Sequence, residues 1–392
     1  MTTAEMIELA QERFSPDKDG TWPRPFKDLR PGGADRSAIS RAIKKAFVQR
    51  LVKVVPTNLG PEPERLRDLE RELVTRLGLN AVIVIRPMMD GIDEAKPDEV
   101  NDAVHRQIGI AAGALITQGG VFRNGDRIAC SSGRSCYHTV HYLAEGITSS
   151  LVNIELISMA GNLHPRHYAV LPNLRLDADF NTQELARSFG NELVAKYVGR
   201  HAVPRSQAAI LRRQNDALSD ETWKQPVNVA IFGVGIFRQG HKMFTVAHTP
   251  HPDFAPIQPF LRELADIAAK YTTDDYCPVA DIANHLLFIR PLNKAAVPAR
   301  VQSRIEALMK VVNARTLTVS EVQLGRIQNG ILIAGTVHKT VPVLQLLRQF
   351  SVRYLCTDVQ LATRLLQLLN EENGAAHGGG STAQGRPRKT TK

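Results

Sequence analysis

The chain has 392 residues, 43% of them hydrophobic, and a formal net charge of +10. This length and apolar content predict more than one domain with a sizeable core, which excludes a largely disordered chain. The basic excess favours a polyanionic partner, and it leaves open nucleic acid, an acidic membrane surface and phosphorylated ligands.

Cysteine usage and the N-terminal sequence predict a soluble protein of the reducing cytoplasm. The chain has 4 cysteines and no close CxxC pair, so we expect neither a disulfide framework nor a zinc site. The N-terminus lacks the basic and apolar regions of a signal peptide. No apolar run approaches the roughly 18 residues of a membrane span, so we expect no membrane partner.

Residues 36–50 predict a short basic helix with two different faces. Its apolar side chains recur at the spacing of a buried stripe, and no acidic residue interrupts the segment. Guanidinium and hydroxyl groups on the other face can contact guanine edges and phosphates in a major groove. The predicted contacts to double-stranded DNA are Arg36, Ser37, Ser40, Arg41, Lys44 and Lys45. The alternative is an ordinary solvated basic face.

The flanking segments complete a predicted winged helix-turn-helix over residues 1–60. Residues 51–55 read Leu-Val-Lys-Val-Val, which favours a strand and hence the wing. Prolines and glycines interrupt residues 15–35, so the first half of the motif is irregular.

A charged helix follows over residues 61–79 and is expected to end at Gly78. Its leucines, which mark one side, are Leu66, Leu69, Leu73 and Leu77. We interpret it as a linker helix that joins two copies of the chain.

From residue 80 to 371 the pattern predicts an α/β domain. Apolar β-branched runs alternate with helical segments, which is typical of a parallel sheet covered by helices on both faces. The expected strands are 81–85, 127–130, 152–157, 227–232, 330–334 and 352–356, and the expected helices are 98–116, 135–145, 181–198, 257–270, 340–350 and 359–370. Thr318 to Glu321 predicts a capping box, and Asp358 is expected to cap the last helix.

Residues 372–392 are expected to form a disordered basic tail, since glycine, serine, threonine and basic residues replace the apolar periodicity. Gly385-Arg-Pro-Arg-Lys389 resembles the core of an AT-hook, which lies in a narrow minor groove. The alternative is a tail that only aids solubility or attracts DNA without specificity.

The turn Ser131-Ser-Gly-Arg-Ser135 is the first candidate ligand site, because ligands of open α/β sheets bind at the carboxyl ends of strands. The start of the next helix favours an anion. Arg134 and the hydroxyls of Ser131, Ser132 and Ser135 can add hydrogen bonds to a phosphate, with Gly133 between them. The alternative is a plain strand-to-helix turn.

A second turn, residues 334–339, follows the strand 330–334. Gly335 allows close approach of the backbone to a ligand, and Lys339 can direct an ammonium toward it. A third group follows other strands and comprises Gly161, Asn162, Gly233, Gly235 and the run Asp281 to Asn284. Packing explains such glycines equally well, and Asp281 alternatively caps a helix.

No metal, cofactor or catalytic site is predicted. The histidines that invite a metal assignment are His138, His141, His164, His167, His285 and His338, and none has a carboxylate at a recognised ligand spacing. A GxSxG elbow is also absent.

Over residues 36–370 the chain resembles the SorC family of bacterial transcriptional regulators, which is grouped with DeoR-type sugar-binding regulators. The resemblance rests on the order of several segments: Arg36–Ala46, Leu51–Val54, Leu69–Leu79, Gly125–Ile128, Ser132–Ser135, Val229–Gly235, Ala280–Ile282, Ile333–Gly335 with Lys339, and Thr357–Asp358.

The resemblance implies a winged helix-turn-helix joined to an effector domain with the fold of sugar-phosphate isomerases. It implies homodimers or homotetramers that bind operator DNA and a phosphorylated sugar. The effector-binding residues carried over are Ser132, Gly133, Arg134, Ser135, Gly161, Gly235, Asp281, Gly335 and Lys339. Three places depart from the family pattern. The segment Ala129-Cys130 lacks the usual glycine before the phosphate loop, Asn162 stands where a second glycine is common, and Ala280 replaces the glycine before Asp281.

Two other functions stay open at this stage. One is an isomerase or deaminase of the same fold, in which Asp281 and His285 supply the acid and base. The basic helix 36–50 is superfluous to such an enzyme. The other is a regulator that has lost its ligand and only bridges DNA.

Overall fold

The computed structural model describes residues 63–89, 97–145, 151–161, 177–189, 193–200, 202–238, 242–248, 254–274, 276–292 and 297–378. The predicted DNA-binding helix and wing, Asn162 and residues 379–392 lie outside the described residues.

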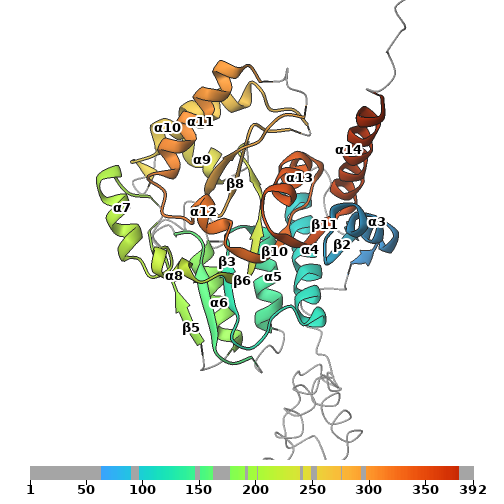
Figure 1. The fold of residues 1–392 in the computed structure, drawn as a ribbon, viewed down its shortest axis with the longest axis horizontal. Coiled ribbons are helices and arrows are strands. Elements are labelled where there is room, and N and C mark those ends of the chain that lie inside the picture. Colours follow the sequence, from blue (N-terminus) through green and yellow to red (C-terminus); the bar gives the residue numbers. More distant parts are fainter. Residues whose placement is uncertain are drawn as a thin grey trace, which may run out of the picture.

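An 8-stranded sheet forms the centre of the described chain, in the order β1-β2-β11-β10-β6-β3-β4-β5 (Figure 1). Its strands are β1 (Glu64–Arg65), β2 (Ala81–Arg86), β3 (Arg127–Cys130), β4 (Ile154–Ser158), β5 (Leu193–Lys196), β6 (Val227–Gly233), β10 (Ile327–Ile333) and β11 (Val352–Asp358). Neighbouring strands are parallel, except that β1 at one edge is antiparallel to β2. The predicted parallel α/β sheet is therefore present.

Alternation along the strands explains why both faces are covered. In β2, Val82 and Val84 belong to one buried cluster, and Ile83 and Ile85 belong to another. The helices α4 (Pro97–Gly119), α5 (Arg134–Glu145) and α6 (Ala178–Phe189) contribute to the second cluster. The helices α3 (Arg67–Leu77), α13 (Thr340–Gln349) and α14 (Val359–Gly378) contribute to the first.

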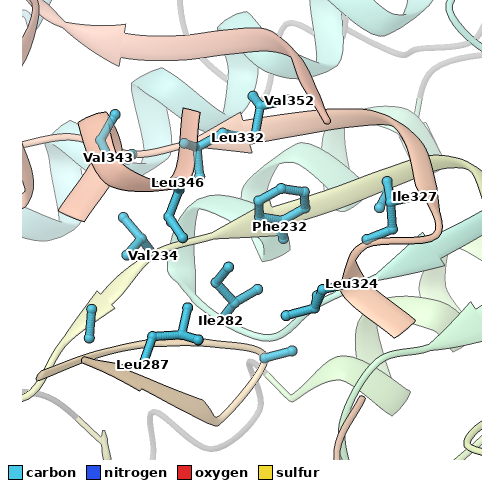
Figure 2. Close-up of a cluster of buried hydrophobic side chains, with 14 of the residues drawn as sticks. Phe232, Val234, Ile282, Leu287, Leu324, Ile327, Leu332, Val343, Leu346 and Val352 are labelled. Carbon is cyan, nitrogen blue, oxygen red and sulfur yellow. The ribbon is translucent and has the colours of Figure 1, made fainter. Parts of the chain in front are cut away.

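A 3-stranded antiparallel sheet, β7-β8-β9, adjoins the carboxyl end of β6. Its elements are β7 (Gly235–Ile236), β8 (Val279–Ile282) and β9 (His285–Phe288), with α9 (Lys242–His248), α10 (Gln258–Ala269) and α11 (Ala299–Asn313) packed against them. Figure 2 shows Ile282 and Leu287 of this sheet facing Phe232, Leu324 and Leu346, so the two sheets share one apolar core.

The hairpin β8–β9 corrects the expectation that Asp281 follows a strand or caps a helix. Asp281 lies within β8, and its Oδ2 accepts the N–H of Asn284 at 3.0 Å. Ala283 and Asn284 form the connecting turn with φ of 51° and 66°, which is the two-residue turn that matches the strand twist.

The expected helix 181–198 is wrong beyond residue 189. The helix α6 ends at Phe189, and Leu193–Lys196 forms β5, which pairs with β4 at the sheet edge. An edge strand buries only part of its side chains, so its apolar pattern is weak. Three further short helices complete this side of the fold: α7 (Arg205–Gln214), α8 (Asp220–Lys224) and α12 (Glu321–Leu324).

The capping box lies two residues later than expected. Ser320 caps α12, and its partner is Gln323. The Thr318 hydroxyl instead donates to the carbonyl oxygens of Met159 and Ala283, at 3.1 and 2.5 Å, and joins two loops.

The leucine-bearing segment packs against the central sheet. Residues 64–65 form β1, α3 begins at Arg67, and Gly78 ends it with φ of 65° as expected. Leu73 is fully buried, and Leu66, Leu69 and Leu77 pack against the same core. Because these leucines cover the protein's own sheet, they do not form an exposed stripe for a second copy.

Asp358 caps the last helix as expected, since the N–H of Leu361 donates to its Oδ1 at 2.8 Å. It continues to Gly378, however, so the tail cannot begin at residue 372. Glu372 is paired with Arg348 of α13, and Glu371 is paired with Arg364 at 3.0 Å. These pairs favour helix over coil at the residues where the apolar pattern fades.

Among the helices that the structure describes, none combines the length and the hydropathy needed to cross a membrane.

Candidate functional site

The strand order places a switch point between β3 and β6. From β3 the chain continues outward to β4 and β5, whereas β6, β10 and β11 follow on the other side of β3. Ligands of open α/β sheets bind at such a point, beyond the carboxyl ends of the strands. The turn 131–135 follows β3, Gly235 follows β6, and the turn 334–339 follows β10, all at this edge.

The turn 131–135 leads directly into the start of α5. The N–H of Ser131 donates to Ile231 in β6 at 2.9 Å, and the side-chain amide of Asn181 in α6 donates to the Ser131 carbonyl at 2.8 Å. Gly133 has a φ of 113°, a value that disfavours any side chain, although a Cβ there would contact nothing within 4 Å. The turn is therefore anchored at its first residue and open at its middle.

Ser135 and Arg134 contact the helix α4. The His105 Nδ1 and the Ser135 Oγ are hydrogen-bonded at 2.8 Å, and both residues are buried. Arg134 lies 4.0 Å from Asp102 and keeps 26% of its side chain exposed. A weak ion pair and partial exposure leave the guanidinium able to meet a ligand.

The turn 334–339 is packed much more tightly. A Cβ on Gly335 would overlap Ile108 Cδ1 of α4 and lie 2.8 Å from Asp358 Oδ2. The N–H of Thr336 donates to the same Asp358 oxygen at 2.6 Å. Glycine is thus required here for close packing within the protein, which is a different reason from the close approach of a ligand expected from the sequence.

Lys339 ends the short 3₁₀ helix η6 (Val337–Lys339). Charged groups near both turns shift its pKa. Burial and then the positive charge of Arg134 lower the pKa of Lys339 to about 8, while Asp358 and Asp281 act in the opposite direction. Burial also raises the pKa of the Asp358 carboxyl. Lys339 and Arg134 therefore face one region, where each makes the other's charge less favourable.

Gly235 and Asp281 are brought together as cross-strand partners of β7 and β8. Asp281 is 6% exposed and acts electrostatically on Lys339. Gly161 is buried after β4, where its N–H donates to Leu317 at 3.0 Å, so its described contact is one of packing.

The sequence-predicted residues thus divide into two groups. Ser131, Ser132, Gly133, Arg134, Ser135, Gly235, Asp281, Gly335 and Lys339 lie at the carboxyl edge around β3, β6 and β10. Gly161 lies one strand farther out, beside β3 but away from β10.

Sequence reasoning missed His105 and Asn181. Each comes from a helix distant in sequence and reaches the turn 131–135 through one hydrogen bond. The available signal for His105 was its place between Val104 and Ile108 on the apolar side of a predicted helix, where a polar residue needs a buried partner.

The acid–base pair Asp281 and His285 does not form. In the hairpin register Asp281 pairs with Leu286, and His285 pairs with Ile282, so the two side chains leave opposite faces. His285 instead lines a cavity of about 830 Å³ with Asn313 and Arg348. Burial and then Arg212 lower its pKa to about 4.

The chemistry of the carboxyl edge suits an anion. Two cationic side chains, serine hydroxyls and the start of α5 are donors that a phosphate accepts from. Within the described ranges, no group of three or more histidine, cysteine or acidic side chains is placed to hold a metal ion. The 4 cysteines are buried and free.

Comparisons with known proteins agree with this geometry. A family model described as "Putative sugar-binding domain" matches residues 61–259, from β1 through α9 to the start of α10. The fold and site define a sugar-binding α/β domain, and the chain belongs to this family. The sugar-binding domain that the sequence resemblance implied is thereby confirmed, and full-length SorC shares its fold. A search of curated proteins found no match.

Solved structures share the fold at low sequence identity. The full-length sorbitol operon regulator SorC from Klebsiella pneumoniae is 19% identical, with a TM-score of 0.50, over 93% of this chain and 98% of that chain. A sugar-binding domain of a transcriptional repressor from Vibrio fischeri is 16% identical, with a TM-score of 0.53, over 78% and 100%. A DeoR family transcriptional regulator from Listeria monocytogenes is 14% identical, with a TM-score of 0.52, over 76% and 98%.

Proposed function

We propose that the protein is a cytoplasmic DNA-binding transcription regulator whose operator affinity changes when a phosphorylated sugar or related anionic metabolite binds. The observation that carries the proposal is the convergence of Arg134, Ser135 and Lys339 at the switch point of a sugar-binding domain. A phosphate group is well matched by two cationic side chains and a helix start.

The proposed effector-binding residues are Ser131, Ser132, Gly133, Arg134, Ser135, Gly161, Asn162, Gly235, Asp281, Gly335 and Lys339. The turn 131–135 would take the phosphate, because it combines hydroxyls with the start of α5. Asp281 would accept from sugar hydroxyls, since a carboxylate offers only acceptors and burial keeps water from competing.

DNA binding is proposed for helix 36–50 within an N-terminal winged helix-turn-helix of residues 1–60. Support comes from the net charge of +10, from the segment's lack of acidic residues, and from the similar structures, which are of transcriptional regulators. The match to full-length SorC extends over more of this chain than the match to the isolated Vibrio fischeri domain.

A homodimer or homotetramer is proposed because operators read by winged helices are commonly two-fold. The leucines of α3 pack against the protein's own core, so we do not assign the interface to them. Light scattering at micromolar concentration, with and without operator DNA, measures the state directly, and a monomer in both conditions would contradict the proposal.

Effector binding is tested by thermal shift with a panel of sugar phosphates and their unphosphorylated counterparts. A ligand at about a hundred times its dissociation constant stabilises the folded state by about 2.7 kcal/mol. We expect stabilisation by one or more phosphorylated members only. Lys339→Met should reduce it by half or more, and Lys310→Met, at an exposed lysine of α11, should not change it. Equal stabilisation of wild type and Lys339→Met would refute the site.

DNA binding is tested with genomic fragments and the joint replacement of Arg36, Arg41 and Lys44 by glutamine. The log–log salt slope should become shallower by about one for each phosphate contact removed, and operator discrimination should be lost. Sequence-specific binding that survives the triple replacement would overturn the assignment of helix 36–50.

A further inference from the structure

His105 is a buried polar residue on the apolar side of α4 that the proposed function does not use. It is 7% exposed between the core residues Val104 and Ile108. A histidine in such a place needs a hydrogen-bond partner. Its partner is Ser135, the last hydroxyl of the anion turn, with 2.8 Å between Nδ1 and Oγ.

The surroundings of His105 are mostly cationic. Lys339 of η6, Arg134 of α5 and His138 of α5 each disfavour a positive charge on its ring. The neighbouring charges are themselves offset in part. His138 is acted on by Asp102 and Arg106 of α4, and Lys339 is acted on by Asp358 and Asp281. Burial comes first among the causes that hold the pKa of His105 well below its ordinary value, so the ring is neutral at pH 7.

A neutral histidine can make this hydrogen bond in two ways. Either the Ser135 hydroxyl donates to an unprotonated Nδ1, or an Nδ1–H donates to the Ser135 Oγ. In the first arrangement the hydroxyl proton is already donated to His105. In the second it is free, and the serine can donate it to a ligand. An anion in front of the turn accepts a hydrogen bond and therefore favours the second arrangement.

The Ser135 backbone is fixed independently of this hydrogen bond. Its carbonyl oxygen accepts the hydroxyl of Thr139 at 2.8 Å, and Gly109 of α4 packs closely against the same carbonyl. A tight α4–α5 contact holds the two side chains in register, so the hydroxyl direction is the remaining degree of freedom.

We propose that His105 is a positioning residue of the anion site: its Nδ1–H holds the Ser135 Oγ so that the hydroxyl donates to a bound phosphate oxygen. This inference rests on the proposed function, because it assumes that a phosphate group binds at the turn 131–135. His105 itself does not touch the ligand. Its effect passes entirely through Ser135.

The test is a double-mutant cycle measured as the affinity of the full-length chain for inorganic phosphate, by calorimetry at pH 7. His105→Phe keeps the ring volume and removes the hydrogen bond, so affinity should fall roughly 2- to 12-fold, the range of one hydrogen bond. Ser135→Ala should cause a similar loss. In the Ser135→Ala background, the His105→Phe change should have no further effect, because the partner is already absent.

His105→Asn supplies a conservative variant. Its amide can donate from near the position of Nδ1, so we expect affinity within about twofold of wild type. Chemical denaturation of each variant shows whether it is folded. If the Phe variant does not fold, the Asn variant still tests the inference.

Two outcomes separate this inference from the proposed function. Wild-type affinity in His105→Phe, or equal losses with and without Ser135, would refute the role of His105 while leaving the anion site intact. Absence of phosphate and sugar-phosphate binding by the wild-type chain would refute the site itself, and the inference with it.

Discussion

The two cation-bearing turns at the carboxyl edge are built on opposite principles. The turn 131–135 is held at its first residue, and its middle is open, since a Cβ on Gly133 would meet no atom within 4 Å. The turn 334–339 is fixed by Asp358 and pressed against Ile108 of α4. Both cations are half-buried, and in the second turn burial also lowers the pKa of Lys339.

The difference shows how one site can combine a turn that adjusts to its ligand with a cation that is held in place. An open turn can adjust its donors to a ligand at little cost, because few packed atoms must move. A packed turn holds Lys339 near two carboxylates and one guanidinium, and these neighbours help to set the pKa of its ammonium group. We therefore expect changes in the packed turn to have the larger effects.

The largest expected effect is on ligand affinity in Lys339→Met. Methionine keeps the length of the side chain and removes its charge, so a charge-assisted hydrogen bond worth about 1.5–3 kcal/mol is lost. Affinity for the best sugar phosphate should fall roughly 10- to 100-fold, as measured by calorimetry. Stability should not decrease, since the charge that is removed is partly desolvated. Lys310→Met is the matched control, and an equal loss in both variants would show a non-specific charge effect.

Gly335→Ala should be the most destabilising glycine change in the two turns. The new methyl group would overlap Ile108 Cδ1 and crowd Asp358, which is overpacking that costs about 1–3 kcal/mol. Urea denaturation measures the loss of unfolding free energy. Ile108→Val deletes the overlapping atom and should restore part of the stability. Gly133→Ala, where the cost is only backbone strain, should not respond to Ile108→Val, and if it does the two turns are not distinct.

The pH dependence of binding sharpens the same contrast. In the free protein the pKa of Lys339 is about 8, and a bound dianion raises it toward its ordinary value. Binding then takes up protons, so affinity is constant somewhat below pH 8 and falls as pH rises through it, by roughly tenfold between pH 7 and 9. Dissociation constants measured at both values check this. An unchanged decline in Lys339→Met would assign the proton to another group.

Much of the fold was predictable because its strands are short apolar runs with clear limits. The expected strand 127–130 coincides with β3, and the expected strand 227–232 ends one residue before β6 ends. The failures share one cause, which is that a weak local pattern was decided by tertiary contacts. Leu193–Lys196 became a strand only because β4 offers it a partner, and α3 is part of the core because its own Leu73 is buried against the sheet.

The site was predictable to the extent that it is local. Both turns carry their signal within five or six consecutive residues, so a strand followed by Ser-Ser-Gly-Arg-Ser or by Gly-Thr-Val-His-Lys was enough to find them. His105 and Asn181 could not be assigned in this way, because their link to the turn 131–135 spans 30 and 50 residues of sequence. Only the packing of α4 and α6 brings them there.

The smallest expected effect concerns the ion pair that restrains the open turn. Asp102 lies 4.0 Å from Arg134 and is 58% exposed, so the pair is solvated and contributes at most about 0.5 kcal/mol to stability. Asp102→Asn keeps the shape of the side chain and releases the guanidinium. It also removes a negative charge that opposes an incoming anion. Affinity for a sugar phosphate should therefore rise about twofold to threefold with little change in unfolding free energy.

Asp68→Asn is the matched control, since Asp68 forms an exposed ion pair with Arg71 on α3, an element that contributes no residue to the carboxyl edge. It should change neither affinity nor stability. Calorimetry at two ionic strengths adds a second check, because an effect on exposed charges shrinks as salt increases. A lower affinity in Asp102→Asn would mean that Asp102 holds Arg134 in its binding position, and the turn 131–135 would then be preorganised like its packed counterpart.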